Sequence, residues 1–278
     1  MSVINTTVAA NNAYLNLSRT SGMLQKSIQK LSSGFRINRS ADDAAGASIA
    51  NGLRATARSL QAAQRNATQA NAVLQIADGA VTTVASILDR MKELATQAAS
   101  DNSDSTARTN LDAEYQALVL EMDRIASTTK YQENVLTDGS AATLTFLVGS
   151  SGDYAGNDTV TVDPSTVDLT SATLLGTVGD LTDLGNAQTE LAAIDGAITL
   201  VGTAIGVIGA AQSRIEFAAS NVAITYQNIV AAESSIRDAD MAFEMTQFTK
   251  AQILQQAGTA MLAQANQTPQ TVLSLLRS

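Results

Sequence analysis

The sequence contains no cysteine, no histidine and no tryptophan. Without cysteine or histidine the chain cannot form Cys/His zinc sites, a cysteine nucleophile or a Ser-His-Asp triad. The lack of cysteine leaves the compartment open, because secreted proteins without disulfides and cytosolic proteins both show it. Aromatic residues make up 4% of the chain although 45% of it is hydrophobic. This composition favours long helices packed side by side over a compact enzyme core.

Proline is nearly absent and charge is unevenly distributed. The two prolines, Pro164 and Pro269, leave both flanks free of the strongest helix breaker. A net charge of −9 argues against general nucleic-acid binding. Residues 1–40 carry basic but no acidic side chains, whereas residues 131–213 carry no Lys or Arg. We interpret the second segment as a solvated acidic surface.

The N-terminus lacks the apolar core of a signal peptide, and no segment reaches the roughly 18–20 continuous apolar residues of a membrane span. We therefore expect no cleavable signal peptide, no membrane partner, and any export to follow another route than ordinary secretion.

Heptad spacing is the strongest pattern in the chain. Steps of four and three residues over 49–98 predict one helix about 75 Å long. Its seam comprises Ile49, Leu53, Thr56, Leu60, Ala63, Ala67, Ala70, Leu74, Ala77, Val81, Val84, Leu88, Met91, Ala95 and Ala98. The polar run at 100–105 ends this helix. A second helix follows with Ser103 or Ser105 as a plausible N-cap, and its stripe is Leu111, Tyr115, Leu118, Met122 and Ile125.

The rhythm disappears between about 129 and 181 and then returns. "ATLTFLVG" (142–149) and "DTVTVD" (158–163) alternate apolar and polar residues around a turn-rich segment, which predicts a small β-hairpin. Residues 184–229 again follow heptad spacing, with Ile194, Val201, Ile205 and Ile208 among the apolar positions. Three glycines within this helix, Gly202, Gly206 and Gly209, would allow a neighbour to approach closely.

Both chain ends are amphipathic, so the chain reads as short helix, long helix, β insert, long helix, short helix. We predict a mostly α fold, a long antiparallel coiled-coil bundle with a small β-hairpin insert, in which the first helix lies beside the last. Two terminal helices cannot bury all of their apolar surface against each other, and exposed apolar patches usually mark interfaces. The sequence therefore predicts a subunit whose ends are completed by neighbouring copies.

Two charged clusters flank the predicted bundle. Asp42 and Asp43 are adjacent, so on a helix they point about 100° apart and do not converge on a substrate. Ser40 with Asp43 instead fits a capping box that begins the next helix, and Gly34 fits a cap that ends the first one. We expect Arg36 and Arg39 to form salt bridges with acids of this or a neighbouring subunit. The second cluster comprises Arg237, Asp238 and Asp240, and the fold should bring it beside the first, with complementary charges forming one joint.

Long stretches of both flanks resemble bacterial flagellin, the filament subunit. The N-terminal match is "LSSGFRINRSADDAAGASIANGLRA" (31–55), and "IGAAQSRI" (208–215) also matches. The C-terminal match is "SSIRDADMAFEMTQFTKAQILQQAGTAMLAQANQTPQTVLSLLRS" (234–278). The resemblance covers about 1–128 and 183–278. Where relatives commonly carry an aromatic-Asn-Gly turn, this chain has "KYQENVL" (130–136), which leaves the turn geometry open.

The resemblance implies an inner layer, D0, and a surrounding helical layer, D1. It assigns 1–40 to the N-terminal D0 helix, 41–128 to N-terminal D1 helices, 129–182 to a β-rich D1 insert, 183–235 to the C-terminal D1 helix and 236–278 to the C-terminal D0 helix. The D0 residues expected to drive self-assembly are Leu17, Leu24, Ile28, Leu31, Leu254, Met261, Leu262, Leu273 and Leu276. The joint between D0 and D1 would comprise Gly34, Arg36, Arg39, Asp42, Asp43, Arg237, Asp238 and Asp240.

The resemblance also implies function and partners. It predicts a non-enzymatic subunit without cofactor or metal that assembles helically into the extracellular motility filament. Export would be unfolded, through the flagellar type III apparatus, with a chaperone on the C-terminus and with filament cap and junction proteins as partners. Arg90, Leu94 and Glu114 match positions that contact an animal innate-immune receptor. The alternatives are a hook–filament junction protein and a non-polymerising helical type III secreted protein.

Overall fold

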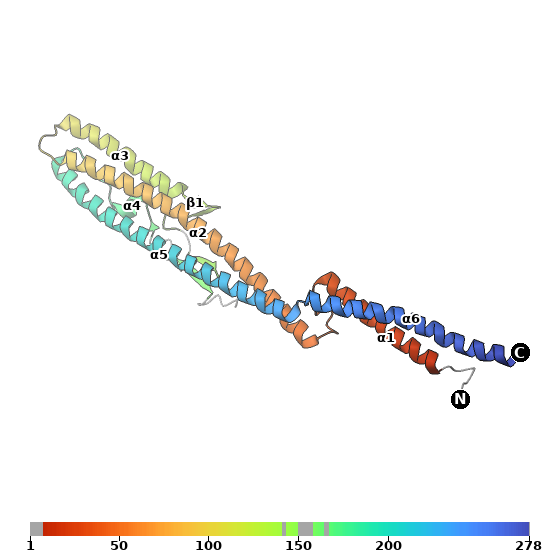
Figure 1. The fold of residues 1–278 in the computed structure, drawn as a ribbon. Coiled ribbons are helices and arrows are strands. Elements are labelled where there is room, and N and C mark those ends of the chain that lie inside the picture. Colours follow the sequence, from red (N-terminus) through yellow and green to blue (C-terminus); the bar gives the residue numbers. More distant parts are fainter. Residues whose placement is uncertain (1–7, 141–142, 150–157, 164–166, 278) are drawn as a thin grey trace. The chain divides into compact units, whose positions relative to one another are not determined.

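The computed structural model describes residues 8–140, 143–149, 158–163 and 167–277, with side chains described through residue 267. It is mostly α-helical with two small antiparallel strand pairs, which confirms the predicted fold class (Figure 1). The helices and strands are α1 Val8–Ser33, α2 Ala44–Ala98, α3 Ser105–Thr128, β1 Lys130–Tyr131, β2 Asn134–Val135, β3 Leu144–Leu147, β4 Thr159–Val162, α4 Ser171–Leu174, α5 Leu184–Arg237 and α6 Met241–Arg277.

The chain divides into two units, each described by itself. The terminal unit comprises residues 1–56 and 228–278, and the central unit comprises residues 57–227. The terminal unit therefore holds α1, α6 and the ends of α2 and α5 that lie nearest to them in sequence. The central unit holds the remaining lengths of α2 and α5 together with α3, α4 and the strands.

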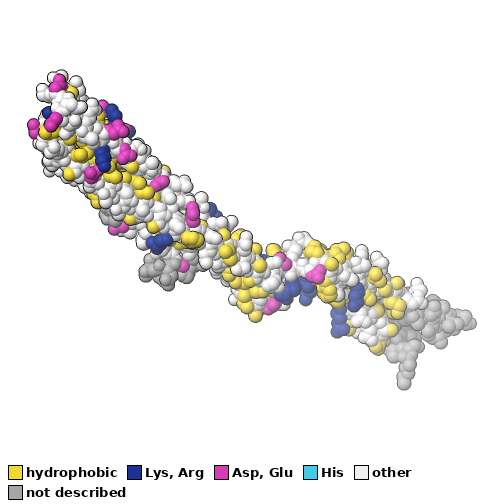
Figure 2. Space-filling model, turned by 60° about the vertical axis from the view of Figure 1, so that its left-hand side comes forward, with side chains coloured by type: hydrophobic (Ala, Val, Ile, Leu, Met, Phe, Trp, Pro, Cys, Tyr) yellow, Lys and Arg dark blue, Asp and Glu magenta, His cyan; other side chains and the backbone are white. Residues whose placement is uncertain are grey.

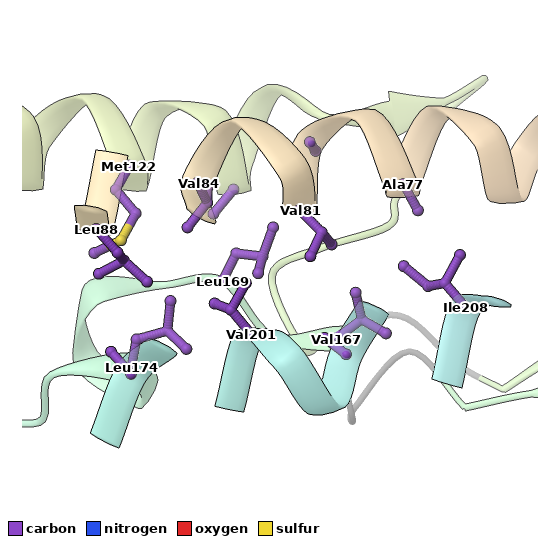
Figure 3. Close-up of a cluster of buried hydrophobic side chains, with 14 of the residues drawn as sticks. Ala77, Val81, Val84, Leu88, Met122, Val167, Leu169, Leu174, Val201 and Ile208 are labelled. Carbon is purple, nitrogen blue, oxygen red and sulfur yellow. The ribbon is translucent and has the colours of Figure 1, made fainter. Parts of the chain in front are cut away.

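The core of the central unit is formed where α2, α3 and α5 lie side by side (Figure 1). From Leu60 to Ala98 every predicted seam position of α2 is buried, so the heptad prediction is confirmed over this length. Figure 3 shows Val81, Val84 and Leu88 of α2 beside Val201 of α5, with Leu169 of the insert between them. The insert thus contributes to the same core as the helices, because its buried valines and leucines cover the seam.

The face of α5 that packs into this core follows a strict heptad. We name it the inner seam, and its members are Ala187, Glu190, Ile194, Ala197, Val201, Ala204, Ile208, Ala211, Ile215 and Val222, all buried. Steps of three and four residues give 3.5 residues per turn, the period of a left-handed coiled coil. Ile205, predicted to belong to the seam, is 41% exposed, so that part of the prediction is wrong.

One polar pair crosses the core of the central unit. Tyr115 of α3 is fully buried and donates a hydrogen bond to Glu190 Oε2 of α5 at 2.5 Å. Glu190 Oε1 accepts a second bond from the backbone N–H of Gly179 at 2.9 Å. Burial first, and then the bond to the Glu190 carboxylate, raises the pKa of the Tyr115 phenol far above its ordinary value. The pair holds α3, the 175–183 loop and α5 in register, because neither buried group has water as an alternative partner.

The predicted β-hairpin is present. β3 pairs antiparallel with β4 in a register that places Leu144 opposite Val162 and Phe146 opposite Val160. The turn predicted between them at 150–157 lies outside the described residues. A shorter hairpin, β1–β2, was not predicted; its turn contains Gln132 at a φ of 56°, a left-handed conformation that non-glycine residues seldom adopt.

The start of α3 differs from prediction. Its N-cap is Asp104, whose Oδ1 accepts a hydrogen bond from the backbone N–H of Ala107 at 2.6 Å, and not Ser103 or Ser105. Ser105 is the first helical residue, whereas Asp104 has the extended backbone that lets a cap side chain turn back onto the first turn. Ser103, Asp104 and Ser105 are all residue types that favour the N-cap position. The backbone conformation decides that Asp104 occupies it.

Two helices, α2 and α5, are long and apolar enough to cross a membrane by length and composition. The sequence had predicted no membrane partner on the ground that no continuous apolar run is long enough. Small apolar residues raise the hydropathy of both helices, and one face of each packs into the bundle core. The apolar character of these faces is thus accounted for by the bundle itself.

The terminal unit is built on the antiparallel pairing of α1 with α6, as the arrangement of helices in the sequence predicted (Figure 1). Ala251 is 2% exposed, and a Cβ placed on Gly258 would lie 3.2 Å from Leu17 Cδ1, so small residues of α6 allow α1 to approach closely. Large apolar side chains stay exposed, among them Tyr14 and Phe243 at 61% and 60%. This confirms that the pair cannot cover its own apolar surface.

Candidate functional site: the joint and the uncovered apolar surfaces

The two charged clusters meet within the terminal unit through backbone hydrogen bonds. The N–H of Arg36 donates to the carbonyl of Arg237 at 2.6 Å, and the N–H of Ala239 donates to the carbonyl of Gly34 at 2.9 Å. Phe35 and Asp238 thereby form an isolated antiparallel bridge. Gly34 ends α1 as predicted: its φ is +76°, and its N–H donates to the carbonyl of Lys30.

The side chains across this joint pair differently from the prediction. Arg36 donates to the backbone carbonyl of Ile236, and among the described residues neither Arg36 nor Arg39 forms an ion pair. The charged bridge is formed instead by Arg54, whose Nε and Nη2 donate to Glu233 Oε1 at 3.0 and 2.7 Å. Sequence reasoning missed this pair, because one member lies in each long helix and no local spacing links them.

Arg237 lies at the centre of the joint. Its guanidinium carbon lies 4.3 Å from the centroid of the Phe35 ring, and its Nη1 lies 3.7 Å from Glu233 Oε1. Stacking a guanidinium on an aromatic face and placing a carboxylate beside it both favour the charged form in one fixed position. Arg237 thus links the loop after α1 to the end of α5.

The aspartates of the joint act as helix and turn caps. Asp43 Oδ1 accepts from the N–H of Gly46 at 2.8 Å and is itself the cap of α2, so the predicted capping box between Ser40 and Asp43 is wrong. Asp42 Oδ2 accepts from the N–H groups of Arg39 and Asn38, and the bond from Arg39 is the main reason that the pKa of this exposed carboxyl is lowered.

At the other side of the joint, Asp240 Oδ1 caps α6 by accepting from the N–H groups of Ala242 and Phe243 at 2.9 and 3.0 Å. Asp238 Oδ2 accepts from the hydroxyl of Ser234 at 2.6 Å. Each of the four aspartates therefore accepts a local backbone or hydroxyl donor at one of its carboxylate oxygens, and two of them, Asp43 and Asp240, thereby stabilise the first turns of α2 and α6.

Gly46, which was not predicted to belong to the joint, allows close packing there. A Cβ at Gly46 would lie 2.8 Å from Ile37 Cδ1 and 2.9 Å from Asp43 Cγ, so any larger residue would displace one of them. Ile37 is 4% exposed and Ala50 is 1% exposed. The connection between α1 and α2 is therefore anchored by a buried isoleucine as well as by its caps.

A buried carboxylate joins α1 to α6. Glu244 is 6% exposed, and its Oε1 accepts from the Ser27 hydroxyl at 2.7 Å while its Oε2 lies 3.4 Å from Lys30 Nζ. Burying a carboxylate is costly without partners, so this pair fixes the register of the two helices against slippage. Glu244 lies more than 200 residues from both partners in the sequence, so no local sequence pattern indicates these contacts.

The residues predicted to drive self-assembly are only partly covered by the terminal unit. Leu17, Leu24, Leu31 and Leu262 are half-buried. Ile28, Leu254 and Met261 are 47%, 44% and 64% exposed. Leu273 and Leu276 belong to α6, but their side chains lie outside the description. Figure 2 shows hydrophobic side chains gathered on the surface of the segment that α1 and α6 form.

The three predicted receptor positions have different exposures. Arg90 Nη2 forms an ion pair with Glu114 at 2.8 Å, and Nη1 forms another with Glu93 at 2.9 Å. The hydrogen bond to Glu114 is the main cause that raises the pKa of Arg90. Leu94 is 2% exposed and packs in the core beneath them. The arginine and the glutamate are therefore available on the surface, whereas the leucine supports them from inside.

A groove of about 420 Å³ lies between α2, the β1–β2 hairpin and β3. The hydroxyl of Tyr131 accepts a hydrogen bond from Gln69 Nε2 at 2.7 Å, and the lining contains amide and apolar side chains without Asp, Glu, Lys or Arg. No group of three or more potential metal ligands occurs among the described residues.

These features together define a class of protein. Long coiled-coil helices, paired terminal helices with a rigid joint, and large apolar surfaces left uncovered are typical of a structural subunit that packs against other subunits.

Comparison with known proteins gives the family. The N-terminal helical region of bacterial flagellin matches residues 4–142 and its C-terminal helical region matches residues 191–276. Flagellin of Halalkalibacterium halodurans is 41% identical over 99% of this chain and 100% of its own length, and flagellin of Bacillus subtilis is 36% identical over 99% of both. The crystal structure of Bacillus cereus flagellin covers 61% of this chain and 94% of its own, with 31% identity and a TM-score of 0.51.

The chain belongs to the bacterial flagellin family, and it is a structural subunit of the flagellar filament. The resemblance inferred from the terminal motifs is thereby confirmed.

Proposed function

We propose that this chain self-assembles helically into the motility filament chiefly through the apolar surface of its terminal unit. The observation that carries the proposal is the exposure of Ile28, Leu254 and Met261 on the α1–α6 pair. Each such side chain gains about 1.5–3 kcal/mol when it is fully buried. Contacts that repeat head to tail between copies give an open polymer, whereas a closed dimer would cap the same surfaces.

The division into inner and outer layers belongs to this proposal. The terminal helices at 1–40 and 236–278 would form the inner D0 layer, and 41–128, 129–182 and 183–235 would form D1. The caps on α2 and α6 and the Arg54–Glu233 pair support a stiff joint between these segments. Such a joint would hold α1 and α6 against the adjoining ends of α2 and α5 within the terminal unit.

Export and partners complete the proposal. The chain is exported unfolded through the flagellar type III apparatus. Before export, a chaperone covers its C-terminus. Filament cap and junction proteins are its other partners in the growing polymer. The uncovered apolar surface of α6 supports a chaperone, because that surface would otherwise promote premature assembly. Arg90 and Glu114 are the exposed part of a contact with an animal innate-immune receptor. The protein acts without a cofactor and performs no catalysis.

Seeded growth tests the proposal. Purified chain mixed with sheared filament fragments should elongate them into long filaments visible by electron microscopy. Replacing Leu254 and Met261 together with glutamate should lower the elongation rate at least about tenfold, because charges would replace two side chains that must be buried. Gln256→Glu on the same helix is the control, since it adds a charge at an exposed polar position.

Two results would contradict the proposal. Wild-type protein that stays monomeric beside competent seeds would exclude self-assembly. Normal elongation by the Leu254→Glu, Met261→Glu variant would show that these surfaces remain uncovered in the polymer.

A further inference from the structure

The groove between α2, the β1–β2 hairpin and β3 has no part in the function proposed above. Its volume of about 420 Å³ falls within the range of small-molecule sites, about 300–1,000 Å³. Its floor is apolar, since Ala70, Val73 and Leu136 line it and are 0%, 4% and 4% exposed. Two half-buried aromatic side chains, Tyr131 and Phe146, line it as well. Such a surface can hold the apolar face of a ring.

The polar groups of the groove are amides from α2 and the β1–β2 hairpin. Asn66 and Gln69 belong to α2, Gln132 to the turn and Asn134 to β2, and all four are exposed. Each amide carries donors and an acceptor side by side. Within the described part of the chain, the side chains of Gln132 and Asn134 have no hydrogen-bond partner. These amides are therefore available to a ligand that both donates and accepts.

Gln69 and Tyr131 are held in place by each other. Gln69 Nε2 donates to the Tyr131 hydroxyl at 2.7 Å. No other bond between described residues uses the Oε1 of Gln69 or the hydroxyl proton of Tyr131, so one acceptor and one donor remain at a fixed separation. Groups that are ordered before a ligand arrives lower the entropic cost of binding it.

Gln132 occupies a position that the backbone would give to glycine. Its φ of 56° is the one positive φ of a non-glycine residue in the described chain. A side chain in this left-handed conformation carries a steric cost that glycine avoids. The hairpin therefore keeps an exposed amide at the groove at the expense of its own stability, and a ligand contact gives that amide a role.

The absence of charge in the lining narrows the class of ligand. No Asp, Glu, Lys or Arg occurs among the described residues that line the groove. A phosphate or carboxylate would find no cation there, and an ammonium group would find no anion. The lining thus argues against nucleotides and acidic sugars and favours a ligand that is polar but uncharged.

The edge of β3 argues against an added peptide strand. The N–H of Val148 donates to the carbonyl of Asp158, and this register turns the N–H and C=O groups of Thr145 and Leu147 toward the unpaired edge. At that edge the Leu147 carbonyl already accepts from Asn66 Nδ2 at 3.3 Å. Thr145 alone within β3 keeps both groups free, which is too few for strand addition.

We propose that this groove binds a neutral saccharide. Each hydroxyl of a sugar ring donates and accepts, which matches the paired donors and acceptors of Gln69, Gln132 and Asn134. The apolar face of the ring packs on Tyr131 and Phe146 above the buried floor. This binding goes beyond the proposed function, because it belongs to the single subunit and needs no assembly.

Saturation-transfer difference NMR on the full-length chain as a dilute monomer tests the proposal. The neutral probes are chitobiose and maltose, and sialyllactose is the acidic probe. We expect saturable binding of at least one neutral disaccharide and weaker binding of sialyllactose. The same disaccharides coupled to beads through their reducing ends separate glycans borne on a surface, which would retain the chain, from free sugars, which would not need to.

Two substitutions assign the binding to the groove. Gln69→Leu should weaken binding at least about tenfold, because it removes one amide and the bond that holds Tyr131. Gln132→Gly should also weaken binding, while the midpoint of thermal unfolding stays unchanged or rises, because glycine adopts the positive φ without strain. Gln64→Leu is the matched control at an exposed position of α2 outside the lining, and it should bind as wild type does.

Three results would overturn the saccharide site. They are no saturable signal from either neutral disaccharide, equal binding by wild type and Gln69→Leu, and stronger binding of sialyllactose than of both neutral probes. None of these results bears on filament growth, which seeded elongation measures separately. Wild-type chain that binds chitobiose and fails to elongate seeds would contradict the proposed function alone.

Discussion

At the scale of single residues, aspartates accept many of the local hydrogen bonds that cap helices and turns in this chain. They occur in clusters that resemble reactive sites, yet each described carboxylate of the joint accepts hydrogen bonds from nearby backbone or hydroxyl groups. One oxygen of Asp42 and one of Asp240 accept two N–H donors each, and one oxygen of Asp43 and one of Asp238 accept one donor each, so local capping accounts for these clusters. In the insert, an aspartate carboxylate likewise accepts hydrogen bonds from nearby backbone and hydroxyl groups, and this makes the free energy of unfolding depend on pH.

Asp168 gives the clearest case. Burial alone would raise its pKa, but hydrogen bonds from the hydroxyl of Thr173 and from the N–H and hydroxyl of Thr170 outweigh burial and lower it below 3.8. A carboxyl whose pKa is depressed in the folded state stabilises the fold above its unfolded pKa, and this contribution is lost as the pH falls through the folded value. The insert should therefore lose stability selectively in acid.

We expect Asp168→Asn to lower the free energy of unfolding of the full chain at pH 6 by up to about 1 kcal/mol. The difference from wild type should shrink as the pH falls from about 3.8 through the lower pKa of the folded state, below which the wild-type carboxyl is also neutral. Urea unfolding between pH 2 and 6 measures both curves. A difference that stays constant over this range would show that the charge of Asp168 plays no part.

At the scale of elements, long-range pairs decide how the helices are held. Arg54 of α2 and Glu233 of α5 form two hydrogen bonds, with side chains 32% and 18% exposed, and Arg237 lies beside the same carboxylate. Partly buried pairs of this geometry contribute more than exposed pairs, because water screens them less and the planar guanidinium is already oriented.

We expect Glu233→Gln to destabilise the terminal unit by about 1–3 kcal/mol, since two guanidinium groups would lose their shared partner. Arg54→Lys should cost less but more than zero, because lysine lacks the planar guanidinium that orients two N–H groups toward the Glu233 carboxylate. A double-mutant cycle in the full chain, followed by hydrogen exchange in α2 and α5, gives the coupling. Strictly additive effects would show that the pair is not energetically linked.

At the scale of the whole molecule, basic side chains are distributed unevenly along the chain. The flanks carry basic residues and exposed apolar side chains, whereas residues 131–213 are acidic and lack Lys and Arg. Assembly therefore brings together apolar surfaces that attract and acidic surfaces that repel each other. The balance between the two depends on ionic strength, because salt screens the repulsion of exposed charges but leaves apolar contacts intact.

Seeded elongation should accordingly become faster as sodium chloride rises from about 10 to 150 mM, a range in which the screening length falls from about 30 to 8 Å. Replacing Asp180 and Asp183, both in exposed turns, with asparagine should flatten this dependence. Light scattering during seeded growth measures the rate. Elongation that slows with added salt would mean that attractive charge pairs, and not apolar contacts, drive assembly.

The sequence by itself determined the architecture. Heptad spacing from Leu60 to Ala98, the paired terminal stripes and the alternating "ATLTFLVG" and "DTVTVD" segments each follow from local periodicity, and the structure keeps them. Gly34 could also be assigned, because a helix end that needs a positive φ favours glycine. Terminal motifs long enough to be specific gave the family.

Only the tertiary structure decided which side chains meet. The capping box at Ser40 was an acceptable pattern, but the backbone places Asp43 at the cap, and Asp104 replaces the predicted serines at α3. Arg54 with Glu233, and Ser27 with Glu244, are far apart in sequence and are brought together by antiparallel pairing alone.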